Sequence, residues 1–452
     1  MAAKKKSIWT FADRFEGDKV VWIIVLLLFL FSIVCMFSSA SRLLKDGATR
    51  IDIVKEQFIV VLGGLALIIL IYNIKNIKIF RFLSSLGFLL SFTLLLLLDV
   101  RINLGPMLKA IQINGAYRIL QVGGFQVHVF EVVKVAMVLY LAWALDADKR
   151  RALPGRRLAD RWKKYLYVYA PFLITFVMII PGSNSSALVI GAIMFILILL
   201  AGGNFKEMSL LLLCGIAIVG ICFSIYKISD GKSLERIGTA ISRISDKHDW
   251  EKQFHESRRG SESYQEALDA MRQPYSARIA VHEGGFFGKG PGQSTQRYVV
   301  PDISEDYMYS FIIEEYGLLG GLAVIFLYLS LLARGSVIVK NCGSDDYAKL
   351  SVAGLCILIT GQAFLHMFVN ADIGPMTGQT LPLISHGTSA FLCFCIAFGV
   401  ILSFSRISAR RIDREIKAGS LMNMNGEEVK SSMDDLDAFD SGKLQNEEDY
   451  GI

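Results

Sequence analysis

The feature that most constrains this sequence is a series of long apolar runs. There are ten, at residues 20–40, 57–73, 80–98, 128–145, 165–181, 185–201, 207–226, 306–333, 350–369 and 387–405. A helix needs about 20 mostly apolar residues to cross a bilayer. Of the 452 residues, 53% are hydrophobic and only 19% are charged, a balance unlike that of a soluble domain. The sequence therefore predicts an all-α polytopic membrane protein with about ten transmembrane helices.

Short basic segments predict the orientation. They are Lys4, Lys5 and Lys6, the segment 146–164, and Arg406, Arg410, Arg411 and Arg414. With ten spans all of them fall on one side, which the positive-inside rule makes the cytoplasm. We therefore expect a cytoplasmic N-terminus at 1–19, a membrane domain at 20–405 and a cytoplasmic tail at 406–452. The largest extracytoplasmic loop is then 227–305, between the seventh and eighth spans.

Several classes of function are not expected. The net charge of +6 is explained by the basic cytoplasmic segments, and the loop 227–305 is of mixed sign, so we expect no nucleic-acid partner. The seven cysteines have no disulfide or zinc spacing, and no P-loop is present. From residue 419 the chain carries nine acidic residues and two lysines. This predicts a disordered tail, either simply solvated or a docking site for a cytoplasmic partner.

The first polar patch is NGAYRILQVGGFQVHVFEVVK at 114–134. A guanidinium on an outer loop can bind an anionic head group in a bidentate manner, so Arg118 is a candidate substrate-binding residue. Glu131 and Lys134 are three residues apart and share a helix face. They form either an ion pair that fixes helix packing or part of a polar cavity.

The second patch is HEGGFFGKGPGQSTQRYVVP at 282–301. Its glycines allow the backbone to approach a ligand closely, and glycine-rich loops can hold phosphates with their N–H groups; ordinary turn formation is the alternative. Lys289 and Gln296 are candidate substrate-binding residues in this patch. Phe286 and Phe287 suggest that the loop dips into the membrane interface.

The third patch is VVPDISEDYMYSFIIEEYG at 299–317. Asp302 and Glu305 have the spacing of a helix capping box. We expect Asp306 one turn inside the helix, with Glu314 on the same face and able to line the same cavity. Glu315 points the other way and is expected to pair with another helix. A carboxylate beside a lipid head group can act as a general base, which makes Asp306 the catalytic candidate.

The fourth patch is NADIGPMTGQTLPLISHGTSA at 370–390. Its prolines and glycines break any helix, so we expect a shaped loop between the last two spans. Irregular backbone at membrane depth is tolerated where it lines a polar cavity or is buried in protein. Asn370 is a candidate cavity residue and Ser385 a candidate substrate contact. His386 is a base, a substrate donor or a structural histidine.

Taken in order, four stretches carry a family resemblance: GAYRILQVGGFQVHVFEVVK, GGFFGKGPGQSTQRYVVP, SEDYMYSFIIEEYGLLGG and TGQTLPLISHGTSA. Together they resemble the motifs of the SEDS family, the FtsW/RodA/SpoVE group of ten-span cell-wall polymerases, over residues 15–410. The resemblance implies an inverting glycosyltransferase that polymerises lipid II into glycan strands. It makes Asp306 the base that deprotonates the acceptor 4-hydroxyl, with Arg118 and Lys289 as candidates for holding the departing pyrophosphate.

The resemblance also implies partners and a place of action. A class B penicillin-binding protein would supply crosslinking, and other divisome proteins would accompany it in the bacterial inner membrane. The segment GDKVVWIIVLLL and the polar tail favour the division branch, hence the septum. A divalent cation, Mg²⁺ or Mn²⁺, could assist the leaving group, although the sequence shows no dedicated site.

Several residues depart from the family pattern. Ile119 replaces a Trp, the segment 181–187 lacks the usual Asp, Glu305 replaces a Thr or Ser, and His386 and Thr388 replace a Tyr and a Gly. These changes bear on substrate contacts rather than on the fold. Two other functions therefore stay open: a lipid II flippase lined by Arg118, Glu131 and Lys134, and a non-catalytic scaffold of the division machinery.

Overall fold

The computed structural model describes residues 16–39, 50–113, 116–155, 159–228, 252–254, 256–259, 261–300, 303–374 and 376–422. The long helices are α2 (Lys19–Ser39), α3 (Arg50–Tyr72), α4 (Ile77–Asp99), α5 (Val129–Lys149), α7 (Ala170–Ile179), α8 (Asn184–Leu200), α9 (Phe205–Ile228), α11 (Glu262–Gly284), α12 (Met308–Asn341), α13 (Asp346–Asn370) and α14 (Thr388–Met422). A short helix α6 (Asp160–Lys164) and a π-helical turn η2 (Tyr165–Tyr169) lead into α7, and a 3₁₀ turn η3 spans Gln296–Tyr298.

Every predicted apolar run coincides with helical chain. Among the described residues, seven helices are long and apolar enough to cross a membrane, namely α2, α3, α4, α9, α12, α13 and α14, and α8 is a shorter apolar helix. The prediction of a polytopic α-helical membrane protein is confirmed.

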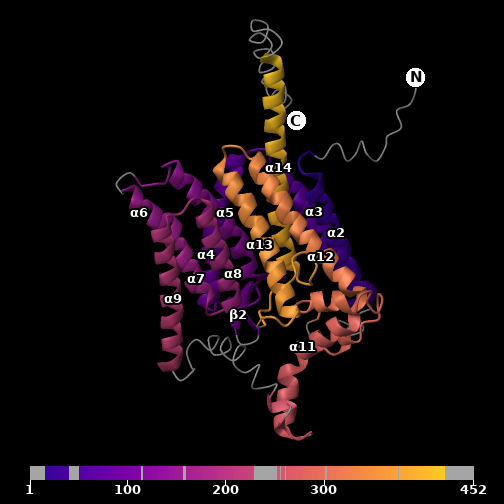
Figure 1. Ribbon diagram of the computed structural model, residues 1–452. Coiled ribbons are helices and arrows are strands. Elements are labelled where there is room, and N and C mark those ends of the chain that lie inside the picture. The colour runs from indigo at the N-terminus through magenta and orange to yellow at the C-terminus, as the bar shows by residue number, and fades with distance from the viewer. Residues whose placement is uncertain are drawn as a thin grey trace, which may run out of the picture.

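The helices differ in how much of their surface they bury. α13 and α14 lie in the middle of the bundle, where α14 packs against α3 and α13 packs against α12 and α5. α9 stands at the edge, with only 12% of its apolar window buried against 83% for α14 (Figure 1). A helix that is apolar all round but little buried presents its side chains to lipid.

The two ends of the bundle have different chemistry. At one end α14 projects beyond the other helices (Figure 1), and ion pairs join Arg334 to Asp18 and Arg81 to Asp345. We refer to this as the α14 end. The opposite end, the α11 end, carries α11 and the irregular segment 376–387.

A small sheet at the α11 end was not predicted. The connection at 99–127 contains β1 (Leu108–Ile113), β2 (Ala116–Val122) and β3 (Phe125–His128), which pair antiparallel in the order β1-β2-β3. Val122 pairs with Phe125, so Gly123 and Gly124 form a two-residue hairpin turn, and Gly123 has a φ of 60°. Such turns need positive φ and therefore favour glycine.

The start of α12 was predicted wrongly. The helix begins at Met308, so Asp306 precedes it in a turn. A second break lies at Gly317, whose φ of 69° and ψ of −172° interrupt the helix. This region of conformational space is essentially restricted to glycine. The expected shared face of Asp306 and Glu314 therefore does not exist.

Candidate active site

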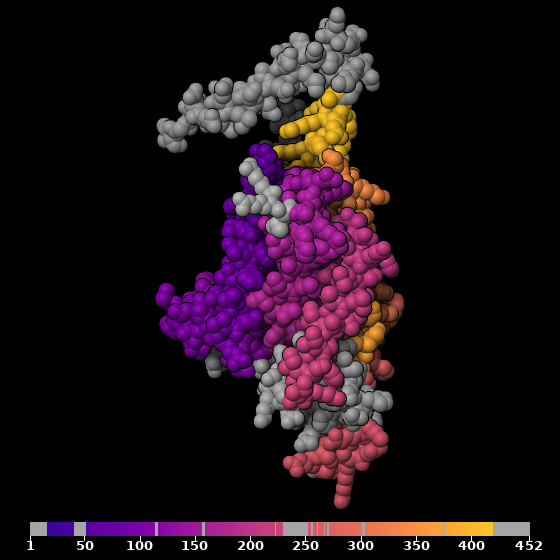
Figure 2. Space-filling view, turned by 90° about the vertical axis from the view of Figure 1, so that its left-hand side faces the viewer, coloured from indigo at the N-terminus to yellow at the C-terminus, as the bar shows by residue number. Residues whose placement is uncertain are grey.

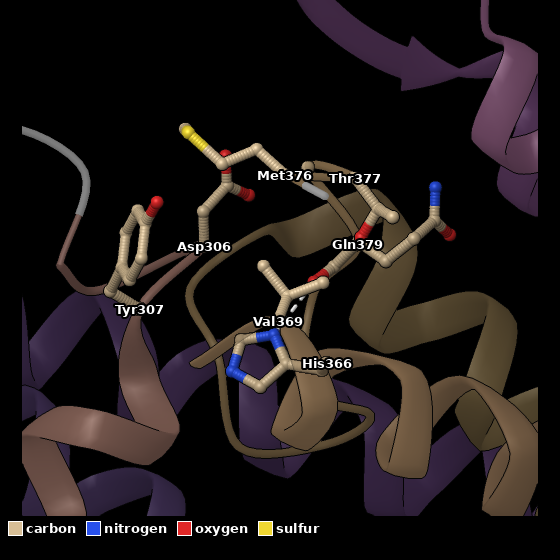
Figure 3. Close-up of a pocket in the computed structure, with 8 residues that line it drawn as sticks. Asp306, Tyr307, His366, Val369, Met376, Thr377 and Gln379 are labelled. Atoms are coloured by element: carbon tan, nitrogen blue, oxygen red, sulfur yellow. Dashed lines mark hydrogen bonds between the residues drawn. The ribbon is translucent and has the colours of Figure 1, made fainter. Parts of the chain in front are cut away.

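Asp306 lies at the α11 end, in the turn that precedes α12, and is half-buried. It borders a small pocket between this turn, α13 and the segment that follows α13 (Figure 3). The lining residues are Asp306, Tyr307, His366, Val369, Met376, Thr377, Gly378 and Gln379. A methyl group added at Gly378 would stand 3.6 Å from Asp306 Oδ2. The carboxylate therefore faces the segment 376–379.

α13 fixes this turn through Asn370. The Asn370 Nδ2 atom donates to the Asp306 carbonyl oxygen at 3.0 Å, and its Oδ1 accepts from the Ser310 N–H at 2.9 Å. Both Asn370 and Ser310 are buried. One amide side chain thus satisfies groups on either side of the α12 start and holds the Asp306 backbone in place.

His366, one helical turn before Asn370, joins the two walls of the pocket. Its Nε2 accepts from the Tyr309 N–H at 3.3 Å, and its Nδ1 lies 2.7 Å from the Gln379 carbonyl oxygen (Figure 3). A carbonyl oxygen can only accept, so Nδ1 carries the proton. His366 is therefore a neutral structural histidine, held by α12 on one side and by the segment 376–387 on the other.

Lys134 anchors the same segment from α5. Its Nζ donates to Glu131 Oε1 at 2.6 Å, Gln362 Oε1 at 2.6 Å and Gln379 Oε1 at 2.9 Å. An ammonium has three protons, so these acceptors satisfy it fully. The Gln379 Nε2 atom continues the network to Ser186 Oγ at 3.1 Å. The geometry matches the ion pair that the sequence offered as one of two alternatives.

Ser385 and His386 hold the Asp306 turn from the opposite side. The Ser385 hydroxyl donates to the Glu305 carbonyl oxygen at 2.7 Å, and the His386 N–H donates to the Ser304 carbonyl oxygen at 2.8 Å. The His386 Nδ1 atom lies 3.4 Å from Glu305 Oε1. Two of the departures from the family pattern, Glu305 and His386, are therefore in contact beside Asp306.

Arg118 reaches this network indirectly. Its Nε donates to the Gly182 carbonyl oxygen at 3.2 Å, in the turn before α8. Three residues further, the Ser185 hydroxyl donates to the Thr377 carbonyl oxygen at 2.7 Å. Thus the divergent segment 181–187 is the link between Arg118 and the wall of the Asp306 pocket.

The glycine-rich loop binds α12 rather than forming an open cradle. The break at Gly317 frees backbone groups of α12, and the loop takes them up: the Lys289 N–H donates to the Glu314 carbonyl oxygen at 2.9 Å and the Gly290 N–H to that of Glu315 at 2.9 Å. A Cβ at Gly288 would lie 2.3 Å from the Glu315 carbonyl oxygen. The close approach predicted for a ligand is made to the chain itself.

Glu314 fills the remainder of this loop. Its Oε1 accepts from the Thr295 N–H at 2.8 Å, the Gln296 N–H at 3.3 Å and Lys289 Nζ at 2.9 Å. Partial burial lowers the pKa of Lys289, but hydrogen bonds to Glu283 and Glu314 outweigh it, so the pKa is raised. Lys289, Gln296 and Glu314 form one cluster, and Glu314 does not line the Asp306 pocket.

Glu315 points away from Glu314, towards α2. It accepts from the Ser38 hydroxyl and from the Gly292 N–H at 3.1 Å, and Arg297 lies 4.0 Å away. The predicted pairing with another helix agrees with this contact to α2. Glu315 is fully enclosed, which leaves it no access to a substrate.

Two further expectations concern absent or uncertain features. Among the described residues, no three His, Cys, Asp or Glu side chains converge to hold a metal ion, so the structure offers no fitting site for Mg²⁺ or Mn²⁺. Asp302 and its proposed capping role lie outside the described residues.

The sequence analysis missed Gln362 and His366. Together with Asn370 they recur every four residues in the apolar run of α13. This spacing places them on one helix face, and polar groups inside a span are rare unless they serve a purpose. The signal was present, and its meaning depended on the segment that this face would meet.

The comparisons with known proteins agree with this arrangement. A model of the FtsW, RodA and SpoVE proteins, described as "cell cycle protein", matches residues 18–410. The chain belongs to the FtsW/RodA/SpoVE family. A probable peptidoglycan glycosyltransferase FtsW from Geobacter sp. (strain M18) is 24% identical over 401 residues, which cover 87% of this chain and 98% of the relative. Stage V sporulation protein E of Bacillus subtilis (strain 168) is 28% identical over 298 residues, covering 65% and 73%.

Solved structures share the fold. A chain from a peptidoglycan synthase complex, reported as the structural coordination of polymerization and crosslinking, gives a TM-score of 0.61 at 20% identity, covering 87% of this chain and 98% of that chain. The rod shape determining protein RodA of Thermus thermophilus gives 0.55 at 20% identity, covering 86% and 97%. The FtsW/RodA/SpoVE architecture is therefore preserved in this chain despite its divergent motifs.

Proposed function

We propose that this protein is a peptidoglycan glycosyltransferase that polymerises lipid II during cell division, with Asp306 as its general base. The observation that carries the proposal is the contrast between Asp306 and its support. The carboxylate borders a pocket and is half-buried, whereas Asn370, His366 and Lys134, which hold the pocket, are buried and hydrogen-bonded. A pre-organised base on rigid elements is what proton abstraction requires.

The proposed reaction transfers one proton and one glycosyl group. Asp306 takes the proton of the acceptor 4-hydroxyl as that oxygen attacks the anomeric carbon of the growing strand. The bond from the anomeric carbon to the lipid pyrophosphate breaks, and inversion follows from a single displacement. Arg118 and Lys289 remain the proposed contacts of the pyrophosphate, and Ser385, His386 and Gln296 those of the sugars. Lys289 would have to exchange Glu283 for the substrate.

Thr377 is a further candidate contact in the same pocket. Its hydroxyl is buried and has no hydrogen-bond partner among the described residues, and Figure 3 shows it beside Gln379 on the wall that faces Asp306. A buried hydroxyl without a partner costs free energy unless a ligand or water satisfies it. A sugar hydroxyl in the pocket would supply that partner.

The proposal also assigns the two faces of the membrane. The basic residues around 146–164 and after Ser405 gather at the α14 end, so this end and both termini face the cytoplasm. The α11 end, with the pocket, then faces outward, where a class B penicillin-binding protein would crosslink the product. We place the protein in the inner membrane at the septum, with the tail 406–452 in the cytoplasm.

The test is polymer formation from purified lipid II in proteoliposomes, with the protein co-purified with its class B penicillin-binding protein. We expect glycan strands from the wild type and a loss of about 10²–10⁴-fold for Asp306→Asn, the usual contribution of a general base. Unfolding temperature and partner binding serve as controls and should not change.

Other outcomes would favour the alternatives. Equal polymerisation by Asp306→Asn would remove Asp306 as the base. Lipid II translocation without polymer, by either form, would favour a flippase. Complementation of a deletion strain by Asp306→Asn would favour a scaffold.

A further inference from the structure

One end of the three-stranded sheet is built from two adjacent turns. Leu108 pairs with Val122, and the Gly123 N–H donates to the Met107 carbonyl oxygen at 2.9 Å. The turn before β1 and the turn between β2 and β3 therefore lie side by side. We call the end formed by residues 104–107 and 122–125 the sheet tip.

The sheet tip is strongly apolar and exposed. Leu104 is 62% exposed, Met107 78% and Phe125 81%, and Val122 is also exposed. Each of these side chains would be costly to leave in water. Their grouping on two hydrogen-bonded turns makes one continuous apolar surface. The inner part of the sheet is different, because Ile119 and Leu120 are buried against the bundle.

The charge of this region has one sign. Residues 100–128 contain Arg101, Lys109 and Arg118 and no acidic residue. The Arg101 guanidinium lies 5.3 Å from the centre of the Tyr117 ring. An apolar tip next to basic side chains matches the boundary between lipid phosphates and acyl chains.

The sheet tip is continuous with a surface that already faces lipid. On α4 the exposed side chains Phe82, Leu86, Leu89, Leu96 and Val100 recur every three to four residues or a multiple of it, so they form one face that ends where the sheet begins. In Figure 2 the violet lobe that contains α4 and the sheet protrudes sideways from the bundle near its α11 end. A lobe in this place extends along the membrane rather than above it.

We propose that the sheet tip is a membrane anchor: Phe125, Met107 and Leu104 insert into the leaflet at the α11 end, and Arg101 and Lys109 contact phospholipid phosphates. The anchor does not depend on the catalytic proposal. It does have a consequence for the pocket, because β2 carries Arg118, whose bond to Gly182 continues through Ser185 to Thr377. The depth of the sheet in the membrane thus sets the position of one wall of the Asp306 pocket.

The experiment measures depth with tryptophan fluorescence and brominated lipids, using the full chain in phosphatidylcholine vesicles with or without phosphatidylglycerol. Phe125→Trp and Met107→Trp are compared with the wild type to subtract the native tryptophans. Leu89→Trp on the exposed face of α4 is the lipid-facing control, and Gln265→Trp on the exposed face of α11 is the water-facing control.

We expect emission from Phe125→Trp and Met107→Trp to shift to shorter wavelength than that of Gln265→Trp. Lipids brominated near the head group should quench it more strongly than lipids brominated deep in the chain. Phosphatidylglycerol should increase this quenching, and Arg101→Gln with Lys109→Gln should remove the increase. A water-like emission without quenching would overturn the anchor, and an equal response in both lipid mixtures would overturn the phosphate contacts.

A second arm separates lipid from protein as the occupant. The same measurement is repeated with the class B penicillin-binding protein reconstituted together with the chain. If Phe125→Trp is unquenched alone and becomes shielded only in the presence of that protein, the sheet tip is a partner surface and the proposal is wrong. Unchanged quenching in both preparations supports insertion into lipid.

Discussion

Two pairs of neighbouring carboxylates, separated by eight residues, have opposite fates in this molecule. Glu314 and Glu315 are enclosed, and each accepts several hydrogen bonds from the loop 289–296. Glu305 is exposed and Asp306 is half-buried beside a pocket. The first pair serves the fold and the second is accessible to a substrate. What separates them is the environment of each carboxylate rather than the residue type.

The difference has a physical origin in the supply of donors. A buried charge must be compensated by hydrogen bonds or opposite charge, and the glycine-rich loop supplies Glu314 with backbone N–H groups and Lys289. Around Asp306 the protein uses its donors on the backbone of the turn, through Asn370 and Ser385. The turn is thereby rigid while the carboxylate stays available to a ligand.

The largest effect on the fold is expected from Glu314→Ala. Each buried donor that loses its acceptor costs about 1–3 kcal/mol, and Thr295 and Gln296 each lose the acceptor of their N–H group. Thermal unfolding in detergent should show a marked drop in the unfolding temperature. Asp306→Asn is the matched control, since it should lower activity and leave the unfolding temperature unchanged.

The contrast between the two pairs would fail if these results were exchanged. An Asp306→Asn protein that unfolds early, or a Glu314→Ala protein that is fully stable but inactive, would mean that Glu314 belongs to the chemistry.

A smaller effect is expected at Lys134, which supports the pocket from inside. Lys134→Met leaves the Glu131 carboxylate without its cation, and breaking a buried ion pair costs about 3–5 kcal/mol, an upper value here because Glu131 is 13% exposed. Glu131→Gln combined with Lys134→Met removes both charges and should recover part of the loss. Unfolding free energies of the two single variants and the double variant give the coupling directly. Strict additivity would show that the pair is not energetically linked.

The kink in α12 gives the next effect. Gly317→Ala forces an alanine into a region that costs about 1–3 kcal/mol, and its Cβ would lie 2.3 Å from the Phe286 carbonyl oxygen. The glycine-rich loop should loosen, which faster hydrogen exchange at Lys289 and Gly290 would report. Gly361→Ala is the control, because a Cβ there meets open space and alanine favours a helix. Similar exchange in both variants would contradict the intercalated loop.

The sequence was sufficient for the helices and for the identity of the residues around the pocket. Long apolar runs fix the spans because lipid leaves the backbone no other way to satisfy its hydrogen bonds. Asp306, Asn370, Ser385 and His386 were singled out from their positions at span ends, and the structure brings them together. Their roles as site residues remain predictions.

What could not be predicted was the pairing of distant groups. Lys134 meets Gln379 across 245 positions, and nothing local in either segment indicates the other. The glycine cluster at 284–292 predicted a close approach but not its target, which is the α12 backbone. The helix break at Gly317 was missed because a single glycine in an apolar run is compatible with a continuous helix. Each failure concerns a contact that only the assembled bundle creates.

The smallest predicted effect concerns the one contact between two residues that depart from the family pattern. His386 and Glu305 are both partly exposed, and exposed pairs contribute about 0–1 kcal/mol. Glu305→Ser and His386→Tyr should each change polymerisation by less than about tenfold, which corresponds to 1.4 kcal/mol. The double variant, which matches the family at both positions, should lose less than the two single effects combined. Rates that simply multiply would show that the two departures arose independently, and that the Asp306 turn is held by the backbone bonds of Ser385 and His386 alone.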